Sequence, residues 1–158
     1  MKGDESDHEL NGLAEDIFRY FGLGCRNVSK IFIPKGYNLN VFFKAVYKWK
    51  NIIKHPKYLN NYDYNKAVYL MSEFSIIENG FLMLKKDSAY SSPIATIFYD
   101  YYSSLDDLRK KINLEINKVQ CVVSKGFMSN EIEFGKSQLP NLSDYSDGID
   151  PVDFLLKI

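Results

Sequence analysis

The sequence predicts an α/β fold with a largely parallel sheet and flanking helices. Segments whose apolar residues recur at helical spacing alternate with short β-branched or apolar runs, and turn residues separate them. The run over 119–124 is apolar, with a pattern typical of a strand buried in a parallel sheet. The chain has 158 residues, of which 46% are hydrophobic and 25% are charged. It is therefore long enough for one domain with its own core.

The first half of the chain is predicted to contain three helices and one strand. Ser6 or Asp7 caps the first helix, whose apolar side faces the core while Asp16 faces away, and Gly22 and Gly24 end it. The predicted elements are a helix over 9–21, a strand over 28–34, a helix from Asn38 or Asn40 to Lys54, and a helix over 62–74. In the last helix, the expected core residues are Ala67, Leu70, Met71 and Phe74.

The second half is predicted to supply further strands, one more helix and a long loop. The helix begins near Leu105 and continues through Ile112, with Ser103 or Ser104 as its cap. Strands are expected over 81–84, 94–100 and 119–124, followed by a loop over 132–150 and a last turn over 151–156. We expect residues 1–8 to be flexible and residues 9–158 to form one domain.

Charge and hydropathy exclude several classes of protein. The 20 basic and 20 acidic residues cancel, which argues against a nucleic-acid binder, because such proteins need an excess of cations. No apolar run approaches the roughly 20 residues that a membrane-spanning helix requires. The chain opens on polar, acidic residues rather than a secretory signal. Its two cysteines are therefore expected to be free thiols in the cytoplasm.

The segment from Gly22 to Asn27 carries the most chemical information. Cys25 lies between a predicted helix end and a strand, beside Gly24, so substrate and backbone N–H groups can approach it closely. Arg26 is placed to favour the reactive thiolate. A small buried cysteine in a tight turn is the alternative interpretation, and we expect Cys121, within its apolar run, to be buried.

Four segments together resemble one enzyme family. FGLGCRNVSK, which contains Cys25, resembles the nucleophile loop of the acyl-CoA reductase family, a branch of the aldehyde dehydrogenase superfamily that includes the fatty-acid reductase of bacterial bioluminescence. NNYDYNKAVYLM, then SSPIATIFYDYYSSLDDLRKKI with VQCVVS, and then FGKSQLPNLSDYSDGID resemble the C-terminal region of that family in the same order. The resemblance implies a partial catalytic domain with an aldehyde dehydrogenase-like fold.

The resemblance also implies a two-step reaction. The Cys25 thiolate attacks an acyl-CoA and forms an acyl-cysteine thioester, which NADPH or NADH then reduces to a fatty aldehyde. The backbone N–H of Cys25 is the implied oxyanion donor, and Gly22, Gly24, Arg26 and Asn27 belong to the implied substrate loop. We expect no metal, because the two cysteines and two histidines show no metal-ligand spacing. The partners implied are acyl-CoA and either a second copy of the chain or a complementary N-terminal reductase half.

The sequence also departs from the family. Only a short segment precedes Cys25, whereas the family carries most of its nucleotide-binding domain before the cysteine. Gly22-Leu23-Gly24 follows a predicted helix rather than the strand that precedes a dinucleotide-binding loop. We therefore expect that domain to be absent and assign no cofactor-binding residue.

Three other interpretations remain open. A non-catalytic fragment, or a module that pairs with a larger reductase, fits the same segments. A cysteine hydrolase would need His8 or His55 as its base. For the polar clusters at 63–65 and at Asp144, Tyr145, Asp147 and Asp150, turn and cap roles are favoured over catalysis.

Overall fold

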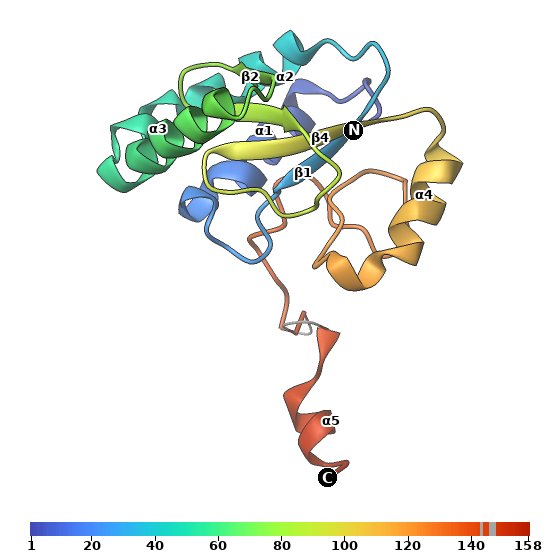
Figure 1. Cartoon of the computed structure of the whole chain (residues 1–158). Coiled ribbons are helices and arrows are strands. Elements are labelled where there is room, and N and C mark those ends of the chain that lie inside the picture. Colours follow the sequence, from blue (N-terminus) through green and yellow to red (C-terminus); the bar gives the residue numbers. More distant parts are fainter. Residues whose placement is uncertain (143, 146–147) are drawn as a thin grey trace.

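The computed structural model describes residues 1–142, 144–145 and 148–158. Within them, the sheet has four strands in the order β1-β4-β3-β2 (Figure 1). β1 and β3 run parallel to β4, and β2 runs antiparallel to β3, so the predicted largely parallel α/β fold is confirmed. The strands are β1 (Lys30–Pro34), β2 (Ile76–Glu78), β3 (Met83–Lys86) and β4 (Thr96–Tyr102).

Alternate side chains of β1 face two separate apolar clusters. Ile31 and Ile33 join the main core with helices α1 (Asp7–Phe18), α2 (Leu39–Val46) and α3 (Pro56–Met71). Phe32 points the other way and packs in a smaller cluster with α4 (Leu105–Leu114). Because side chains alternate along a strand, β1 separates the three-helix layer from α4.

The first helix begins at Asp7, slightly before the expected start. Ser6 caps it in a capping box, in which Glu9 accepts a hydrogen bond from the Ser6 N–H. In the segment before it, which we expected to be flexible, the Met1 carbonyl accepts a hydrogen bond of 2.8 Å from the Tyr102 hydroxyl.

The second predicted helix is divided. Asn38 caps α2 as expected, but from Tyr47 the chain continues as the 3-10 helix η2 (Tyr47–Lys54). α3 then begins at Pro56, earlier than expected, because proline is well suited to the first turn of a helix.

The predicted buried face of α3 was wrong. Tyr58, Tyr62, Asn65 and Tyr69 are buried, whereas Ala67, Leu70, Met71 and Phe74 are exposed. The tyrosine rings supply the apolar surface, and their hydroxyls find partners, such as the Phe81 carbonyl at 3.0 Å from the Tyr58 hydroxyl. Asn79 and Gly80 lie between the antiparallel strands β2 and β3, and β2 itself was not predicted.

The predicted buried strand over 119–124 was also wrong. These residues are half-buried or exposed, and Val123 makes only an isolated bridge with Ile132. The Ile132 N–H donates to the Val122 carbonyl at 2.8 Å, so this run pairs with the following loop instead of entering the sheet. The short 3-10 helix η3 (Ile116–Lys118) precedes it, and the last helix, α5 (Pro151–Leu155), projects away from the rest of the protein (Figure 1).

Candidate functional site

Cys25 follows a strained turn at the end of α1. In the 3-10 helix η1 (Arg19–Gly22), Tyr20, Phe21 and Gly22 have φ of 56°, 61° and 74°, all in the left-handed region. Only the glycine adopts this conformation without a steric cost, and each of the other two costs about 1–3 kcal/mol. The surrounding contacts must therefore hold this turn. It directs the chain into the segment over 22–27 that contains Cys25, called the cysteine loop below.

A side chain at Gly24 would require its neighbours to shift. A Cβ atom at this position would be 2.6 Å from Asn27 Oδ1 and 2.8 Å from Gln138 Oε1. The close approach of these two side chains, rather than a left-handed conformation, is what requires glycine here.

Both polar ends of the Asn27 side chain hold the cysteine loop against α1. Its Oδ1 accepts a hydrogen bond of 2.6 Å from the Gly24 N–H. Its Nδ2 donates to the carbonyls of Asp16 at 3.0 Å, Ile17 at 2.9 Å and Arg19 at 3.2 Å. Asn27 thus caps the last turn of α1 and fixes the backbone on both sides of Cys25.

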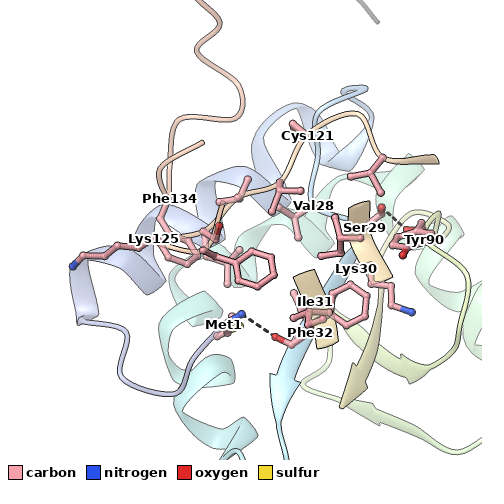
Figure 2. Close-up of a pocket in the computed structure, with 18 of the residues that line it drawn as sticks. Met1, Val28, Ser29, Lys30, Ile31, Phe32, Tyr90, Cys121, Lys125 and Phe134 are labelled. Carbon is pink, nitrogen blue, oxygen red and sulfur yellow. Dashed lines mark hydrogen bonds between the residues drawn. The ribbon is translucent and has the colours of Figure 1, made fainter. Parts of the chain in front are cut away.

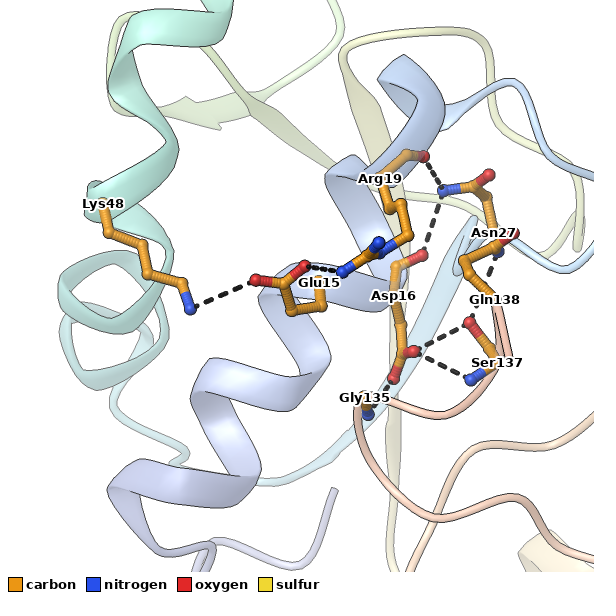
Figure 3. Close-up of polar contacts among 8 residues, drawn as sticks. All are labelled: Glu15, Asp16, Arg19, Asn27, Lys48, Gly135, Ser137 and Gln138. Carbon is orange, nitrogen blue, oxygen red and sulfur yellow. Dashed lines mark hydrogen bonds and ion pairs between the residues drawn. The ribbon is translucent and has the colours of Figure 1, made fainter.

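Asp16 does not face away from the core as expected but is fully buried. Its Oδ1 accepts hydrogen bonds from the N–H and the hydroxyl of Ser137, at 3.0 Å and 2.8 Å (Figure 3). Its Oδ2 accepts one of 2.6 Å from the Gly135 N–H. Burial raises the pKa of Asp16, although these hydrogen bonds act in the opposite direction. The prediction failed because the partners of the Asp16 carboxylate, Gly135 and Ser137, lie far along the chain from α1.

The Cys25 side chain is exposed and borders two cavities. The larger has a volume of about 590 Å³ and is bounded by β1, α4 and the extended run over 119–127 (Figure 2). Its apolar lining includes Val28, Ile31, Phe32, Leu108, Val122 and Phe127. The smaller has a volume of about 230 Å³ and lies between the cysteine loop and the turn over 91–95. A nucleophile at Cys25 is therefore accessible from both spaces.

Arg26 and Cys121 also line the larger cavity. The Arg26 side chain is 15% exposed and forms an ion pair of 3.6 Å with Asp144. Part of its positive charge is therefore compensated by that carboxylate. Cys121, expected to be buried, is half-buried, and its partial burial raises the pKa of its thiol. The Asp144 carboxylate also accepts a hydrogen bond of 2.8 Å from the Asn141 N–H, as expected of a turn residue.

The two histidines lie in α1 and immediately before α3. His8 is exposed in the first turn of α1, and the His55 ring packs on Phe21 with 4.4 Å between ring centroids. Among the described residues, neither lines a cavity that Cys25 borders. This placement gives no support to a hydrolase that uses a Cys-His pair.

The other predicted polar cluster lies within α3, so turn and cap roles were wrong for it. Asp63 and Tyr64 are exposed, and Asn65 is buried. The Asn65 Nδ2 donates at 2.9 Å to the carbonyl of Ile94, which lines the smaller cavity. Of the second cluster, Asp150 caps α5 as expected, and Asp147 lies outside the described residues.

The described residues include no dinucleotide-binding loop. Gly22-Leu23-Gly24 follows η1, not the strand that precedes such a loop. Of the two cavities that Cys25 borders, only the larger is within the usual size range of ligand pockets. In the described part of the chain, no group of three or more histidine, cysteine or carboxylate side chains is arranged to hold a metal, and no helix is both long and apolar enough to cross a membrane.

Comparison with known proteins adds no relative. No protein-family model matches the chain, and no curated protein matches it. The function proposed below therefore rests on the cysteine loop, on its two cavities and on the resemblance of the sequence around them.

Proposed function

We propose that this chain is the C-terminal catalytic portion of an acyl-CoA reductase, in which Cys25 accepts the acyl group as a thioester. The observation that carries the proposal is the position of Cys25. Its thiol is exposed on a loop held by Asn27, beside a largely apolar cavity of about 590 Å³. A nucleophilic thiol on a constrained loop next to an apolar cavity suits attack on an apolar thioester.

The proposed step is a thiol-thioester exchange. The Cys25 thiolate forms a C–S bond with the acyl carbonyl carbon, and the bond from that carbon to the sulfur of coenzyme A breaks. Coenzyme A leaves as a thiolate and takes up a proton, so no oxidant or reductant is required. Attacking and leaving sulfurs are chemically similar, and the step is therefore reversible.

The Cys25 N–H is suited to stabilise the negative oxygen formed during this attack. Within the described residues it donates to no backbone or side-chain group, whereas the Gly24 N–H is already bound to Asn27. An unoccupied N–H beside the nucleophile, on a backbone that Asn27 holds in place, is a preorganised oxyanion donor.

The larger cavity is the proposed site of the acyl chain. Apolar side chains from β1, α4 and the run over 119–127 line it, and Cys25 lies on its boundary. Burial of each methylene group stabilises the complex by about 0.8 kcal/mol, so an apolar acyl chain gains affinity from this lining while its thioester stays at the thiol.

Reduction of the thioester to a fatty aldehyde needs NADPH or NADH, which supplies hydride. Since the described residues include no dinucleotide-binding loop, we propose that a complementary polypeptide or a longer reductase binds the dinucleotide. A cytoplasmic location would keep the Cys25 thiol reduced.

A second candidate function is a non-catalytic module that pairs with a reductase. One observation favours it: the C-terminal residues Val152, Phe154, Leu155, Leu156 and Ile158 are all exposed. Apolar side chains gathered on a projecting segment are typical of a surface that another chain covers.

The two candidates differ in the release of coenzyme A. After the protein is mixed with a long-chain acyl-CoA, free coenzyme A is separated by chromatography and measured against time. The catalytic proposal expects a burst of about one equivalent per chain from wild type and from Cys121→Ser, and none from Cys25→Ser. A wild-type protein that is folded by circular dichroism but gives no burst would leave the pairing module as the better account.

A further inference from the structure

We infer that Asp16 is a positioning residue for Cys25, because its carboxylate binds the tail segment (residues 134–142) while its carbonyl binds the cysteine loop; this role rests on the acyl transfer proposed above. Asp16 is fully buried at the last turn of α1 and does not line either cavity. It therefore acts on Cys25 through other residues and not on the substrate.

On the tail side, the Asp16 carboxylate accepts three hydrogen bonds (Figure 3). Two come from the N–H and hydroxyl of Ser137, and one comes from the Gly135 N–H. Ser137 is itself fully buried. A carboxylate accepts hydrogen bonds at both oxygens, whereas an asparagine would present an NH₂ group to one of these donors. The arrangement is therefore specific for aspartate.

On the loop side, the Asp16 main-chain carbonyl accepts hydrogen bonds from two residues that follow Cys25. The Asn27 Nδ2 donates at 3.0 Å and the Val28 N–H at 3.1 Å. One residue thus joins the tail segment to the backbone next to the nucleophile, and a displacement of either side is transmitted to the other.

The tail segment also contacts the loop and α1 directly. Gly135 has φ of 83°, and a Cβ at this position would be 3.0 Å from Gly12 Cα, so the tail backbone lies against α1. Gln138 lies so close to Gly24 that a Cβ there would be 2.8 Å from its Oε1. The cysteine loop is therefore enclosed between the end of α1 and the tail, and Asp16 sets the spacing between them.

The experiment compares two reactions of the same thiol in Asp16→Asn. Acyl transfer, followed as coenzyme A release, needs the Cys25 thiol and the Cys25 N–H in the correct relative position. Alkylation by iodoacetamide needs only an accessible thiol. We expect acyl transfer to slow by roughly tenfold to a hundredfold while alkylation changes little. We also expect faster amide hydrogen exchange over residues 22–28, because the loop loses its support.

Glu15→Gln is the matched control. Glu15 precedes Asp16 on α1 but pairs only at the surface, with Arg19 at 3.0 Å and Lys48 at 3.6 Å. Such exposed ion pairs contribute little to stability. The rates of acyl transfer, of alkylation and of amide exchange over residues 22–28 should therefore remain those of wild type. If Asp16→Asn does not fold, Ser137→Ala keeps the Ser137 N–H bond to Asp16 and removes the two hydrogen bonds of the hydroxyl, one to Asp16 and a longer one of 3.4 Å from Gln138. This variant should slow acyl transfer selectively by a smaller factor.

The outcomes separate this role from the proposed function. A folded Asp16→Asn or Ser137→Ala variant that transfers acyl groups at the wild-type rate would overturn the positioning role. If wild type itself transfers no acyl group, the proposed function fails, and amide exchange then decides the role of Asp16. Unchanged amide exchange over residues 22–28 in the folded Asp16→Asn or Ser137→Ala variant would exclude a role of Asp16 in holding the loop. Faster exchange would show that Asp16 supports the loop.

Discussion

Gly24 shows how narrowly the residues around Cys25 are confined. Its backbone lies against two polar side chains from different parts of the chain, Asn27 and Gln138, and each is too close to admit a methyl group. The constraint on this position therefore comes from Gln138 as well as from Asn27, and it acts on the residue next to Cys25.

We predict that Gly24→Ala destabilises the protein by about 1–3 kcal/mol, since the added methyl group displaces both side chains. Acyl transfer to Cys25 should slow as well, because the loop must shift. Urea denaturation and coenzyme A release measure the two effects. Leu23→Ala, a change at an exposed neighbour, should match wild type in both. A Gly24→Ala protein as stable and as reactive as wild type would show that the loop is not confined.

Glu131 is the residue for which the structure gives the clearest pH dependence. Partial burial raises the pKa of its carboxyl, but hydrogen bonds from the Ser124 hydroxyl and from the N–H groups of Met128, Phe127 and Gly126 together lower it to about 2, from an ordinary 4.5. Glu131 thereby holds the turn after the run over 119–124, which forms one wall of the larger cavity.

Because the folded-state pKa of Glu131 is lowered, its ionised form stabilises the folded protein. This stabilisation is present above about pH 4.5 and is lost as the pH falls toward about 2. We predict that the difference in free energy of unfolding between wild type and Glu131→Gln is largest above pH 4.5 and shrinks at lower pH. Glu133→Gln, at an exposed position, is the control. A difference that stays constant from neutral pH down to the folded-state pKa would contradict the assignment.

At the scale of elements, α3 has a core face made of tyrosines. Tyr58 is 3% exposed, whereas Tyr64 on the same helix is 68% exposed. We predict that Tyr58→Ala lowers the free energy of unfolding by about 3–5 kcal/mol, because it leaves a cavity, and that Tyr64→Ala changes it by no more than about 0.5 kcal/mol. Urea denaturation of both variants checks this, and equal effects would show that the helix is rotated.

The elements differ in how far the sequence predicts them. Caps at Ser6, Asn38, Ser104 and Asp150 were predictable because a short polar side chain next to a periodic segment has few other roles. The buried face of α3 was not, since tyrosine serves equally on a surface and in a core. The run over 119–124 was mistaken for a buried strand because its composition is apolar. In the structure it lines the larger cavity, and its one bridge joins Val123 to Ile132.

The sequence predicted the exposure of Cys25 only as one of two alternatives, and it did not predict what holds the loop. Glycines next to a cysteine are compatible with an exposed thiol or with a small buried one; Cys25 is exposed, and its role as a nucleophile stays a prediction. The hydrogen bonds from Gly135 and Ser137 to Asp16 join two segments that lie far apart in the sequence. The helical pattern places Asp16 off the apolar face of the helix, and it cannot show that residues 135 and 137 pack on that side and bury the carboxylate.

At the scale of the whole molecule, distant segments meet around one thiol. The end of α1 and the tail enclose the loop, β1 and α4 bound the larger cavity, and the turn over 91–95 bounds the smaller one. The C-terminal helix α5 stands apart from this arrangement with its apolar residues exposed (Figure 1). Cys25 thus lies where segments that are distant in the sequence meet, and the partner proposed for α5 would cover its exposed apolar residues.

The central claim is that Cys25 itself carries the acyl group. The most direct measurement is the intact mass of the protein after incubation with a long-chain acyl-CoA. We predict that wild type and Cys121→Ser each gain the mass of one acyl group, which hydroxylamine removes as expected of a thioester, and that Cys25→Ser gains none. An acyl group that persists on Cys25→Ser, or a folded wild-type protein that gains no mass, would contradict the claim.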